Sequence, residues 1–338
     1  GTSVSVNRQW LLVRRPQGTL SLDDFKYQET PFTPPALKDG EVLVRNKMFS
    51  LVPAQRTWMN ADSSYFPPME LHKPVVSPAV SEVVASANPK YPVGSLVNGM
   101  TGWEDYTLLS GRFWAGLLPP GVDPVDAVSL FGGNTLTAYF GLLKIGQPKE
   151  GETVVVSGAA GSTGSMAAQI ARIKGCTVIG IAGGKAKCDW LLSACKLHGA
   201  IDYRNENVAA RLKELAPKGV DVFFDNVGGT IMQDVIDNMA MYGRVAVCGQ
   251  IAEYNSSGPA PGPRDMFRIV SHRLRIQGFI SADFMGERNA ALAELTQWAQ
   301  AGALIHRADV RAGFKNLPTT YFDLFNGGNT GTLMLKAD

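Results

Sequence analysis

The 338-residue sequence has little cysteine and no long apolar run, and neither sign of charge dominates. Its four cysteines, Cys176, Cys188, Cys195 and Cys248, are too few for a disulfide scaffold at this length. We expect them to act as small buried apolar residues in a cytoplasmic protein. No apolar run reaches the roughly 18 residues that cross a bilayer, and the N-terminus shows no charged-then-apolar signal pattern. We therefore expect no membrane partner.

The charge balance argues against a polyanionic partner. Lys and Arg total 32 against 30 Asp and Glu, a net charge of +2, so no chain-wide field attracts nucleic acid. Charged residues make up 18% and hydrophobic residues 45%, as in ordinary soluble proteins. The composition thus favours a globular protein, of about two domains at this length, that binds a small molecule.

The first third of the chain is rich in short β-type runs separated by proline and glycine. Apolar residues alternate within residues 10–13, 41–46, 81–85 and 96–100. After about residue 303 short β runs return, most clearly at 331–336. These patterns predict an antiparallel, barrel-type module formed by both chain ends.

The middle of the chain alternates helical patterns with apolar runs. A helix is expected over residues 127–143, and strands are expected at the apolar runs 153–157, 176–181, 220–224, 244–247 and 275–280. This alternation is typical of a doubly wound parallel sheet of the Rossmann type. We therefore predict an α/β protein with one domain at 129–302 and the other at 4–128 plus 303–338.

The most informative stretch is residues 154–164, which read VVVSGAAGSTG before an amphipathic helical pattern that ends near Gly175. An apolar strand, a glycine turn and a helix in this order favour binding of a dinucleotide pyrophosphate at the helix N-terminus. Ala159 stands where the usual motif has its first glycine, while Gly161 and Gly164 hold the other two places. The alternative is a glycine turn that only packs a strand against a helix.

The choice of cofactor is expected at the end of the second strand. An NAD site usually has Asp or Glu there, whereas residues 181–187 read IAGGKAK, with no acid and two lysines. Lys187, with Lys185 or Arg204 nearby, favours the 2′-phosphate of NADPH. Tyr203 and Arg204 could flank that phosphate. The alternative for each lysine is a solvated helix start.

No metal site is expected. His72, His198, His272 and His306 are scattered, no cysteine precedes residue 176, and the cysteine spacings do not match a structural zinc lobe.

Without a metal to polarise a carbonyl, hydride delivery to the β-carbon of an activated alkene is favoured. Tyr254 lies just past a strand end, where open α/β sheets bind ligands, and is the expected catalytic residue. Its alternative is a surface tyrosine in a proline-rich loop.

Several motifs in order resemble one family across nearly the whole chain. They are NRQW at 7–10, RTWMN at 56–60, LTAYFGL at 136–142, AAGSTG at 159–164, DNVGG at 225–229, YN at 254–255 and NTG at 329–331. The chain resembles the zinc-free medium-chain dehydrogenase/reductases, in the leukotriene/prostaglandin reductase branch with bacterial curcumin reductases and plant double-bond reductases.

This resemblance implies a GroES-like domain beside the Rossmann domain, a homodimer, and NADPH-dependent reduction of the C=C bond of α,β-unsaturated ketones and aldehydes. It implies that Lys187 and Tyr203 hold the 2′-phosphate, that Asn226 and Asn329 contact the cofactor, and that Tyr254 is the active-site tyrosine. The full expected cofactor-binding set is Gly158, Ala160, Gly161, Ser162, Thr163, Gly164, Gly184, Lys187, Tyr203, Asn226, Cys248, Gly249, Tyr254 and Asn329.

The substrate pocket is expected to be hydrophobic and reshaped relative to the family. The chain departs from the usual family pattern at 52–57, 73–78 and 132–135. Aromatic residues near the expected mouth suit a phenyl-bearing enone, although ordinary core packing is an equal alternative for each. The expected pocket residues are Ala54, Arg56, Tyr65 and Trp103.

Two other functions stay open at this point. A quinone reductase shares the cofactor and the lack of metal, and a relative without robust turnover could bind NADPH as an accessory protein. Rates with an enone and with a quinone would separate these from the leading hypothesis.

Overall fold

The computed structural model describes residues 5–62, 65–255 and 262–338, which fold into two units. Unit 1 contains the described residues of 5–128 together with Asn255 and 308–338, and unit 2 contains the rest. The expected first residue of unit 1, residue 4, lies outside the described part of the chain. The first division falls after Val128, but the second falls after Arg307, five residues beyond the expected position.

Hydrogen bonds to helix α4 (Ser162–Ile173) explain why unit 2 extends to Arg307. Arg172 Nη2 donates to Ala303 O at 2.6 Å, and Gln169 exchanges hydrogen bonds with the backbone of Ile305 at 2.9 Å. The sequence pattern indicates where β runs resume after residue 303. It does not indicate which unit supplies the hydrogen bonds to the backbone of the residues just before the first of those strands.

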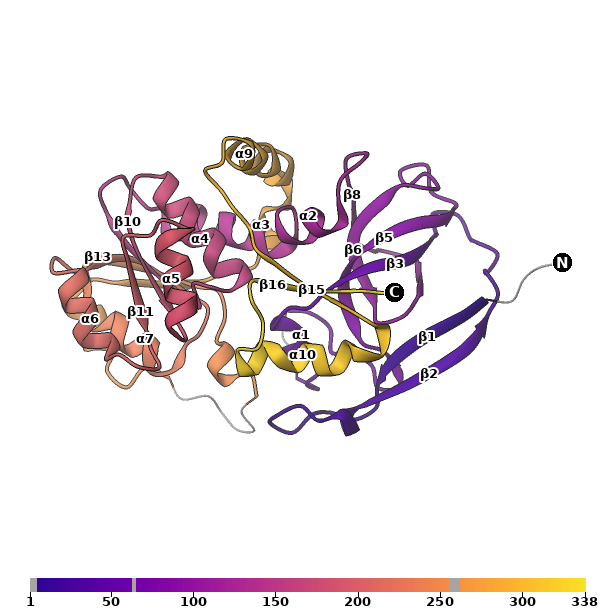
Figure 1. The fold of residues 1–338 in the computed structure, drawn as a ribbon, viewed down its shortest axis with the longest axis horizontal. Helices are drawn as coiled ribbons and strands as arrows, with labels where there is room; N and C mark the ends of the chain where they lie inside the picture. Colours follow the sequence, from indigo (N-terminus) through magenta and orange to yellow (C-terminus); the bar gives the residue numbers. More distant parts are fainter. Residues whose placement is uncertain (1–4, 63–64, 256–261) are drawn as a thin grey trace. The chain divides into compact units, whose positions relative to one another are not determined.

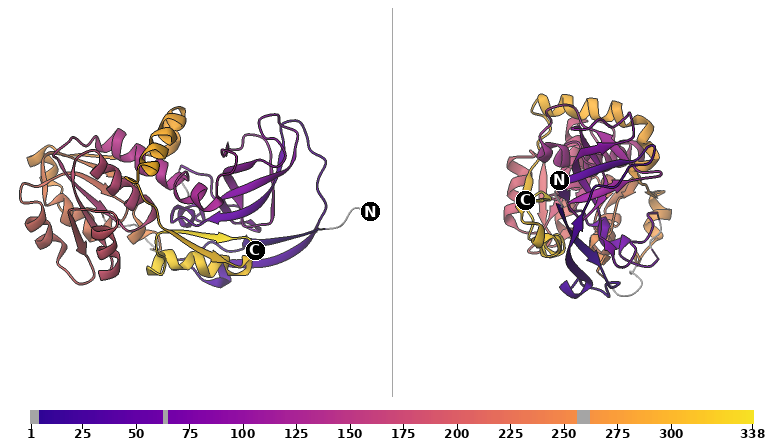
Figure 2. Two further views of the ribbon diagram at one scale, coloured as in Figure 1. Left: turned by 45° about the horizontal axis from the view of Figure 1, so that its top comes forward. Right: turned by 90° about the vertical axis from the view of Figure 1, so that its right-hand side faces the viewer.

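Unit 1 is built mainly from antiparallel strands. One sheet has the order β2-β1-β4, and the other runs β15-β16-β3-β5-β6-β8 with β7 paired to β3. The long pair β1 and β2, in indigo, is seen in Figures 1 and 2. The strands are β1 (Ser5–Leu12), β2 (Phe25–Phe32), β3 (Val42–Ser50), β4 (Lys73–Pro74), β5 (Val76–Ser86), β6 (Leu96–Gly102), β7 (Tyr106–Leu109), β8 (Ala115–Leu117), β15 (Ala308–Ala312) and β16 (Thr332–Lys336).

The two ends of the chain meet in this sheet. β16 pairs antiparallel with β3, where burial alternates over residues 44–48, as the period of a strand requires, and both faces are buried at 42–44 and 48–49. The shared core is rich in aromatic side chains, including Phe49, Trp103 and Phe314. The helices of unit 1 are η1 (Leu22–Asp24), α1 (Ala54–Trp58), η5 (Phe314–Asn316) and α10 (Leu317–Asn326), while α2 (Pro124–Ser129) lies at the boundary.

Unit 2 is the predicted doubly wound sheet. Its strands are parallel in the order β11-β10-β9-β12-β13-β14, which is the arrangement of dinucleotide-binding domains. The strands are β9 (Thr153–Ser157), β10 (Thr177–Ala182), β11 (Gly199–Asp202), β12 (Val220–Asp225), β13 (Met239–Val247) and β14 (Arg275–Gly278). The predicted α/β fold class is therefore confirmed.

Helices cover both faces of this sheet because its inner strands β10, β9 and β12 are apolar on both sides. In β9, Val154 and Val156 pack in one core cluster, and Val155 packs in the other. Helices α3, α4 and α9 contribute to the first cluster and α6 and α7 to the second; Figure 1 labels them. The remaining helices are α3 (Gly133–Phe140), η2 (Gly141–Gly146), α5 (Lys185–Ser193), α6 (Val208–Leu215), α7 (Gly229–Ile236), η3 (Ile251–Glu253), α8 (Phe267–His272), η4 (Ser281–Glu287) and α9 (Arg288–Gln300).

The expected continuous helix over 127–143 is wrong. The chain forms α2, breaks, and resumes as α3 followed by the π-helical turn η2. Gly132 is extended (φ −80°, ψ 172°) and caps α3, because adjacent glycines weaken a helix.

Candidate functional site

The glycine turn after β9 has the geometry of a phosphate-binding turn. Gly158 has a φ of +57°, in the left-handed region, and α4 begins directly after Gly161. A Cβ at Gly164 would lie 2.1 Å from Gly158 O, so no side chain fits between α4 and the turn. The first turn of α4, at the positive end of the helix dipole, follows at Ser162, Thr163 and Gly164.

The alanine in the first glycine place is accommodated by a neighbouring strand. Ala159 is fully buried, and its N–H donates to Ile181 O at 3.0 Å. Gly180 on β10 makes the space, because a Cβ there would lie 2.9 Å from Ala159 Cβ. Ala160 is also buried. The turn therefore keeps its shape without the usual first glycine.

Positive side chains gather where β10 leads into α5. Burial lowers the pKa of Lys187, and the charges of Arg204 and Arg307 lower it further. The Arg204 guanidinium lies 5.9 Å from the Tyr203 ring centroid, and that of Arg307 lies 4.2 Å from the Trp190 ring. This environment favours an anion beside Lys187.

The backbone at Gly183 and Gly184 passes close to the same side chains. A Cβ at Gly183 would lie 2.8 Å from Tyr203 Oη and 3.0 Å from Arg204 Nε, and Gly184 caps α5. Lys185 is different: its exposed ammonium pairs with Asp189 at 2.7 Å on the helix surface. The solvated alternative therefore describes Lys185, whereas Lys187 lies in the cationic cluster.

Sequence reasoning missed two residues of this region. Asp202 ends β11 and accepts hydrogen bonds from Gly184 N (2.9 Å), Arg204 N (3.1 Å) and Asn205 Nδ2 (2.8 Å). These donors lower the pKa of Asp202, so this acid organises the two turns. Arg307 arrives from a segment more than 100 residues away, which no local motif signals. The sequence does show an acidic residue, Asp202, at the end of the third strand of this domain, and that position could have indicated its role.

The loops after β12 and β9 meet through Asn226. Its N–H donates to Ser157 Oγ at 3.0 Å, and its Nδ2 donates to Ser157 O at 2.8 Å. A Cβ on Gly158 would lie 3.3 Å from Asn226 Cβ. The structure thus brings two of the expected cofactor residues, Gly158 and Asn226, side by side.

Tyr254 folds back onto the loop that follows β13. Gln250 N–H donates to Tyr254 Oη at 3.1 Å, and the hydroxyl lies against Gly249. Burial raises the pKa of the Cys248 thiol to about 12, with the charge of Asp225 adding to the shift, so this cysteine is protonated at neutral pH. Cys248, Gly249 and Tyr254 all lie in the loop that follows β13, at the carboxyl end of the sheet.

The remaining expected residues belong to unit 1. Trp103 is 0% exposed and packs beside Phe25 and Tyr321, so its side chain lies in the core and offers no surface to a ligand. Core packing, the alternative to a pocket role, therefore describes Trp103.

Arg56 is also buried, at 1% exposed, and burial lowers its pKa. Its guanidinium donates to Gly18 O (2.9 Å), Asn60 Oδ1 (2.8 Å) and Asn255 Oδ1 (3.2 Å). These contacts give Arg56 a structural role in unit 1.

Other expected contacts in unit 1 are more open. Tyr65 is 57% exposed, and Ala54 is partly buried at the start of α1. Asn329 donates from Nδ2 to Gly331 O at 2.9 Å. These positions remain expectations for substrate and cofactor contact.

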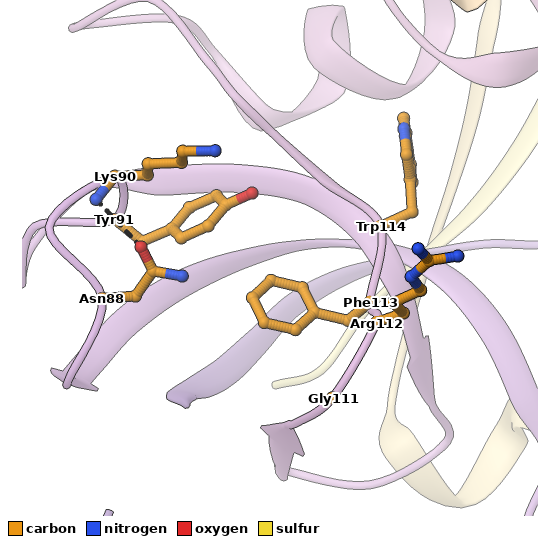
Figure 3. Close-up of a pocket in the computed structure, with 7 residues that line it drawn as sticks. All are labelled: Asn88, Lys90, Tyr91, Gly111, Arg112, Phe113 and Trp114. Carbon is orange, nitrogen blue, oxygen red and sulfur yellow. Dashed lines mark hydrogen bonds between the residues drawn. The ribbon is translucent and has the colours of Figure 1, made fainter. Parts of the chain in front are cut away.

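Two surface hollows lie away from the expected residues. In unit 1, loops 88–91 and 111–114 face each other across the hollow in Figure 3, where the Tyr91 and Phe113 rings are 5.5 Å apart. In unit 2, Lys218, Arg268 and His272 line a hollow near the start of β13. Neither contains a residue that the sequence motifs predict.

Within residues 5–62, 65–255 and 262–338, no three His, Cys, Asp or Glu side chains are grouped so that they could hold a metal ion. Over the same residues, every helix is too short or too polar to span a membrane.

Comparisons with known proteins agree with this architecture. The family model described as the N-terminal domain of oxidoreductase matches residues 8–117, and the model described as zinc-binding dehydrogenase matches residues 162–299. The NADPH-dependent curcumin reductase of Escherichia coli is 35% identical over 98% of this chain and 96% of its own. The NADP(+)-dependent 2-alkenal reductase of Nicotiana tabacum is 35% identical over 86% of each chain.

A solved structure is similar over the same extent. The crystal structure of CurA from Vibrio vulnificus in complex with NADPH has a TM-score of 0.91 and 34% identity, covering 98% of this chain and 99% of its own. The fold and the turn at the helix N-terminus define a nucleotide-binding oxidoreductase. The chain belongs to the medium-chain dehydrogenase/reductases, in their zinc-free branch.

Proposed function

We propose that this protein is an NADPH-dependent reductase of the C=C bond of α,β-unsaturated ketones and aldehydes. The observation that carries the proposal is the likeness, from end to end of the chain, to an NADPH-dependent curcumin reductase and to CurA solved with NADPH. The likeness to a 2-alkenal reductase supports the same chemistry.

The residues of unit 2 fit this cofactor. The turn at Gly158 and the N-terminus of α4 suit the pyrophosphate, since Gly164 leaves no room for a side chain and the helix end carries a positive dipole. Lys187, Tyr203 and Arg204 suit the 2′-phosphate, because their region is positive. Asn226 and the loop of Cys248 and Gly249 would lie along the rest of the dinucleotide.

Tyr254 is the proposed catalytic residue. Its hydroxyl accepts a hydrogen bond from Gln250 N–H, and a phenol that accepts in this way can also donate its proton, toward the cofactor ribose or the substrate. Bound NADPH would supply the hydride that adds to the β-carbon of the substrate. A hydrogen bond from the tyrosine would then stabilise the enolate oxygen, and solvent would supply the final proton.

An assay with two substrate classes tests the proposal. Purified protein is mixed with NADPH or NADH and an aryl enone or a quinone, and loss of absorbance at the nicotinamide band gives kcat/KM for each pair. We expect the enone with NADPH to be the best pair. A higher kcat/KM for the quinone would favour the quinone reductase alternative, and no turnover with NADPH bound would favour the accessory role.

We also propose a homodimer in the cytoplasm. Support comes from an apolar surface on α8, where Phe267 is 70% exposed beside Met266 and Val270, next to the edge strand β14. The cysteines are free, as a reducing compartment requires. Light scattering after gel filtration is expected to give twice the chain mass, and Phe267→Glu to give the monomer mass.

A further inference from the structure

Asp225, the last residue of β12, lies at the centre of the carboxyl end of the sheet but belongs to none of the expected contacts. Its side chain is fully buried. Oδ1 accepts three hydrogen bonds, from Ser157 Oγ (2.8 Å), Val227 N (2.9 Å) and Gly228 N (3.0 Å). The carboxylate thus ties the end of β9 to the turn that follows β12.

Ser157 completes this link from the other side. Its Oγ donates to Asp225 and accepts from Asn226 N at 3.0 Å, while its carbonyl accepts from Asn226 Nδ2 at 2.8 Å. Because both hydrogen-bonding roles of the hydroxyl are used, the Ser157 rotamer is fixed. The position of Asn226 therefore depends on the Asp225–Ser157 pair.

The backbone that Asp225 holds in turn supports the Tyr254 loop. Carbonyl oxygens of residues 225–227 accept hydrogen bonds from four N–H groups of that loop. The pairs are Asp225 O with Cys248 N (2.9 Å) and Gly249 N (3.1 Å), Asn226 O with Ile251 N (3.1 Å), and Val227 O with Ala252 N (3.2 Å). The same loop places Gln250 N–H on the Tyr254 hydroxyl at 3.1 Å.

This arrangement is costly for the fold. Asp225 Oδ2 is buried and has no hydrogen-bond partner among the described residues, and burial raises the pKa of the group. A buried carboxyl group with an unpartnered oxygen destabilises the folded state. An apolar residue at this position would pack without this energetic cost. Packing alone therefore does not explain why the position holds a carboxyl group.

We propose that Asp225 is a positioning residue that holds the loops after β9, β12 and β13 in one arrangement, so that Asn226 and Tyr254 are in place before NADPH binds. It acts through Ser157 and the backbone of residues 226–228 and contacts no reacting atom. The inference rests on the proposed NADPH site. It assigns a role to Asp225, the first residue of the DNVGG motif at 225–229, which is not among the expected cofactor contacts. Its loss should weaken cofactor binding beyond what the loss of stability explains.

The experiment compares Asp225→Ala with Glu152→Ala, a carboxylate removed from the opposite end of the same sheet, where it pairs with Arg244 at 2.7 Å. NADPH affinity is measured by fluorescence titration of each folded variant, and Tm is measured without cofactor. We expect both variants to lower Tm. We expect Asp225→Ala to weaken NADPH binding tenfold or more, Asp225→Asn to weaken it less because one acceptor oxygen remains, and Glu152→Ala to change it less than twofold.

Turnover gives a second reading that a merely structural residue would not change. At saturating NADPH, kcat of Asp225→Ala should fall at least tenfold, because the Tyr254 loop loses its support, while kcat of Glu152→Ala stays near wild type. If Asp225→Ala does not fold, Ser157→Ala decides in its place, with a three- to tenfold loss of NADPH affinity expected.

Two results separate this inference from the proposed function. If the wild-type protein binds NADPH and Asp225→Ala, or Ser157→Ala in its place, matches Glu152→Ala within twofold in affinity and kcat, the positioning role is wrong and the proposed function stands. If the wild-type protein does not bind NADPH, the proposed function is wrong and the inference is overturned with it.

Discussion

The two ends of the parallel sheet in unit 2 both carry charged residues, but these residues have different partners at the two ends. At the amino end, Glu152 and Arg244 form a two-pronged ion pair, with oxygen to nitrogen distances of 2.7 and 2.8 Å. Arg244 also donates to Gly146 O at 3.0 Å. In this pair each charge has an opposite charge beside it.

At the carboxyl end the charged groups have different surroundings. Lys187 lies among other cations, and the Asp225 carboxyl group is buried and accepts its hydrogen bonds from neutral donors. The glycine turn also keeps space free of side chains. The comparison teaches that one end is organised for stability and the other for a ligand, as open α/β sheets generally are. Substitutions at the two ends should therefore separate stability from binding.

The largest effect is expected at Gly164. In Gly164→Ala the new Cβ would lie 2.1 Å from Gly158 O, a backbone atom, so the turn or α4 must move. Such overpacking costs about 3 kcal/mol or more, which lowers Tm by roughly 6 to 12 °C and removes measurable NADPH binding. Calorimetry and titration measure both quantities. Gly286→Ala, where a Cβ meets no atom within 4 Å, is the control; equal behaviour of the two variants would contradict the prediction.

Lys187→Ala should change cofactor choice rather than stability. One charge-assisted contact to the 2′-phosphate contributes about 1.5 to 3 kcal/mol, so NADPH affinity should fall by roughly 10- to 150-fold while NADH affinity hardly changes. Lys185→Ala is the matched control, since Lys185 pairs with Asp189 on the exposed surface. Equal losses for the two cofactors would show that Lys187 does not contact the phosphate.

Tyr254→Phe tests whether the Tyr254 hydroxyl, at the carboxyl end of the sheet, takes part in the reaction. The substitution keeps the ring and removes the hydroxyl that accepts from Gln250 N–H, a donor at an exposed position, so Tm should stay within about 2 °C of wild type. The value of kcat with the best enone should fall about tenfold or more, because the hydrogen bond that would stabilise the enolate oxygen is lost. Unchanged kcat would remove Tyr254 from the reaction.

Local patterns predicted the backbone around the glycine turn, where contacts are close in sequence. The strand, glycine turn and helix around residues 154–164 follow from apolar periodicity and from the steric freedom of glycine. The parallel sheet follows from the alternation of strands and helices. The continuous helix over 127–143 failed because apolar periodicity continued across Gly132 and Gly133, where the backbone breaks.

Tertiary contacts account for the residues that the sequence did not reveal. Trp103 and Arg56 carry the residue types of a binding pocket, but both are buried by partners distant in the chain. Arg307 reaches the Lys187 region from the far end of unit 2, and Asp225 gains its role from hydrogen bonds to Ser157. Contacts between residues far apart in the chain depend on the order of the strands in the sheet, and the spacing of apolar residues along the sequence does not determine that order.

The smallest effect is expected at the amino end, and it should depend on pH. Arg244 holds the pKa of Glu152 below its ordinary value, so the folded-state pKa is lower than the unfolded value of about 4.3. The ion pair therefore contributes its full stability above the unfolded pKa and loses it as pH falls through the folded pKa. Glu152→Gln should lower Tm by about 2 to 4 °C at pH 7, for a loss of about 1 kcal/mol, and leave NADPH affinity within twofold. Thermal melts from pH 7 to pH 3 should show this gap between wild type and variant closing below about pH 4. A gap that persists at pH 3, or a tenfold loss of NADPH affinity, would mean that the two ends of the sheet are not separate in function.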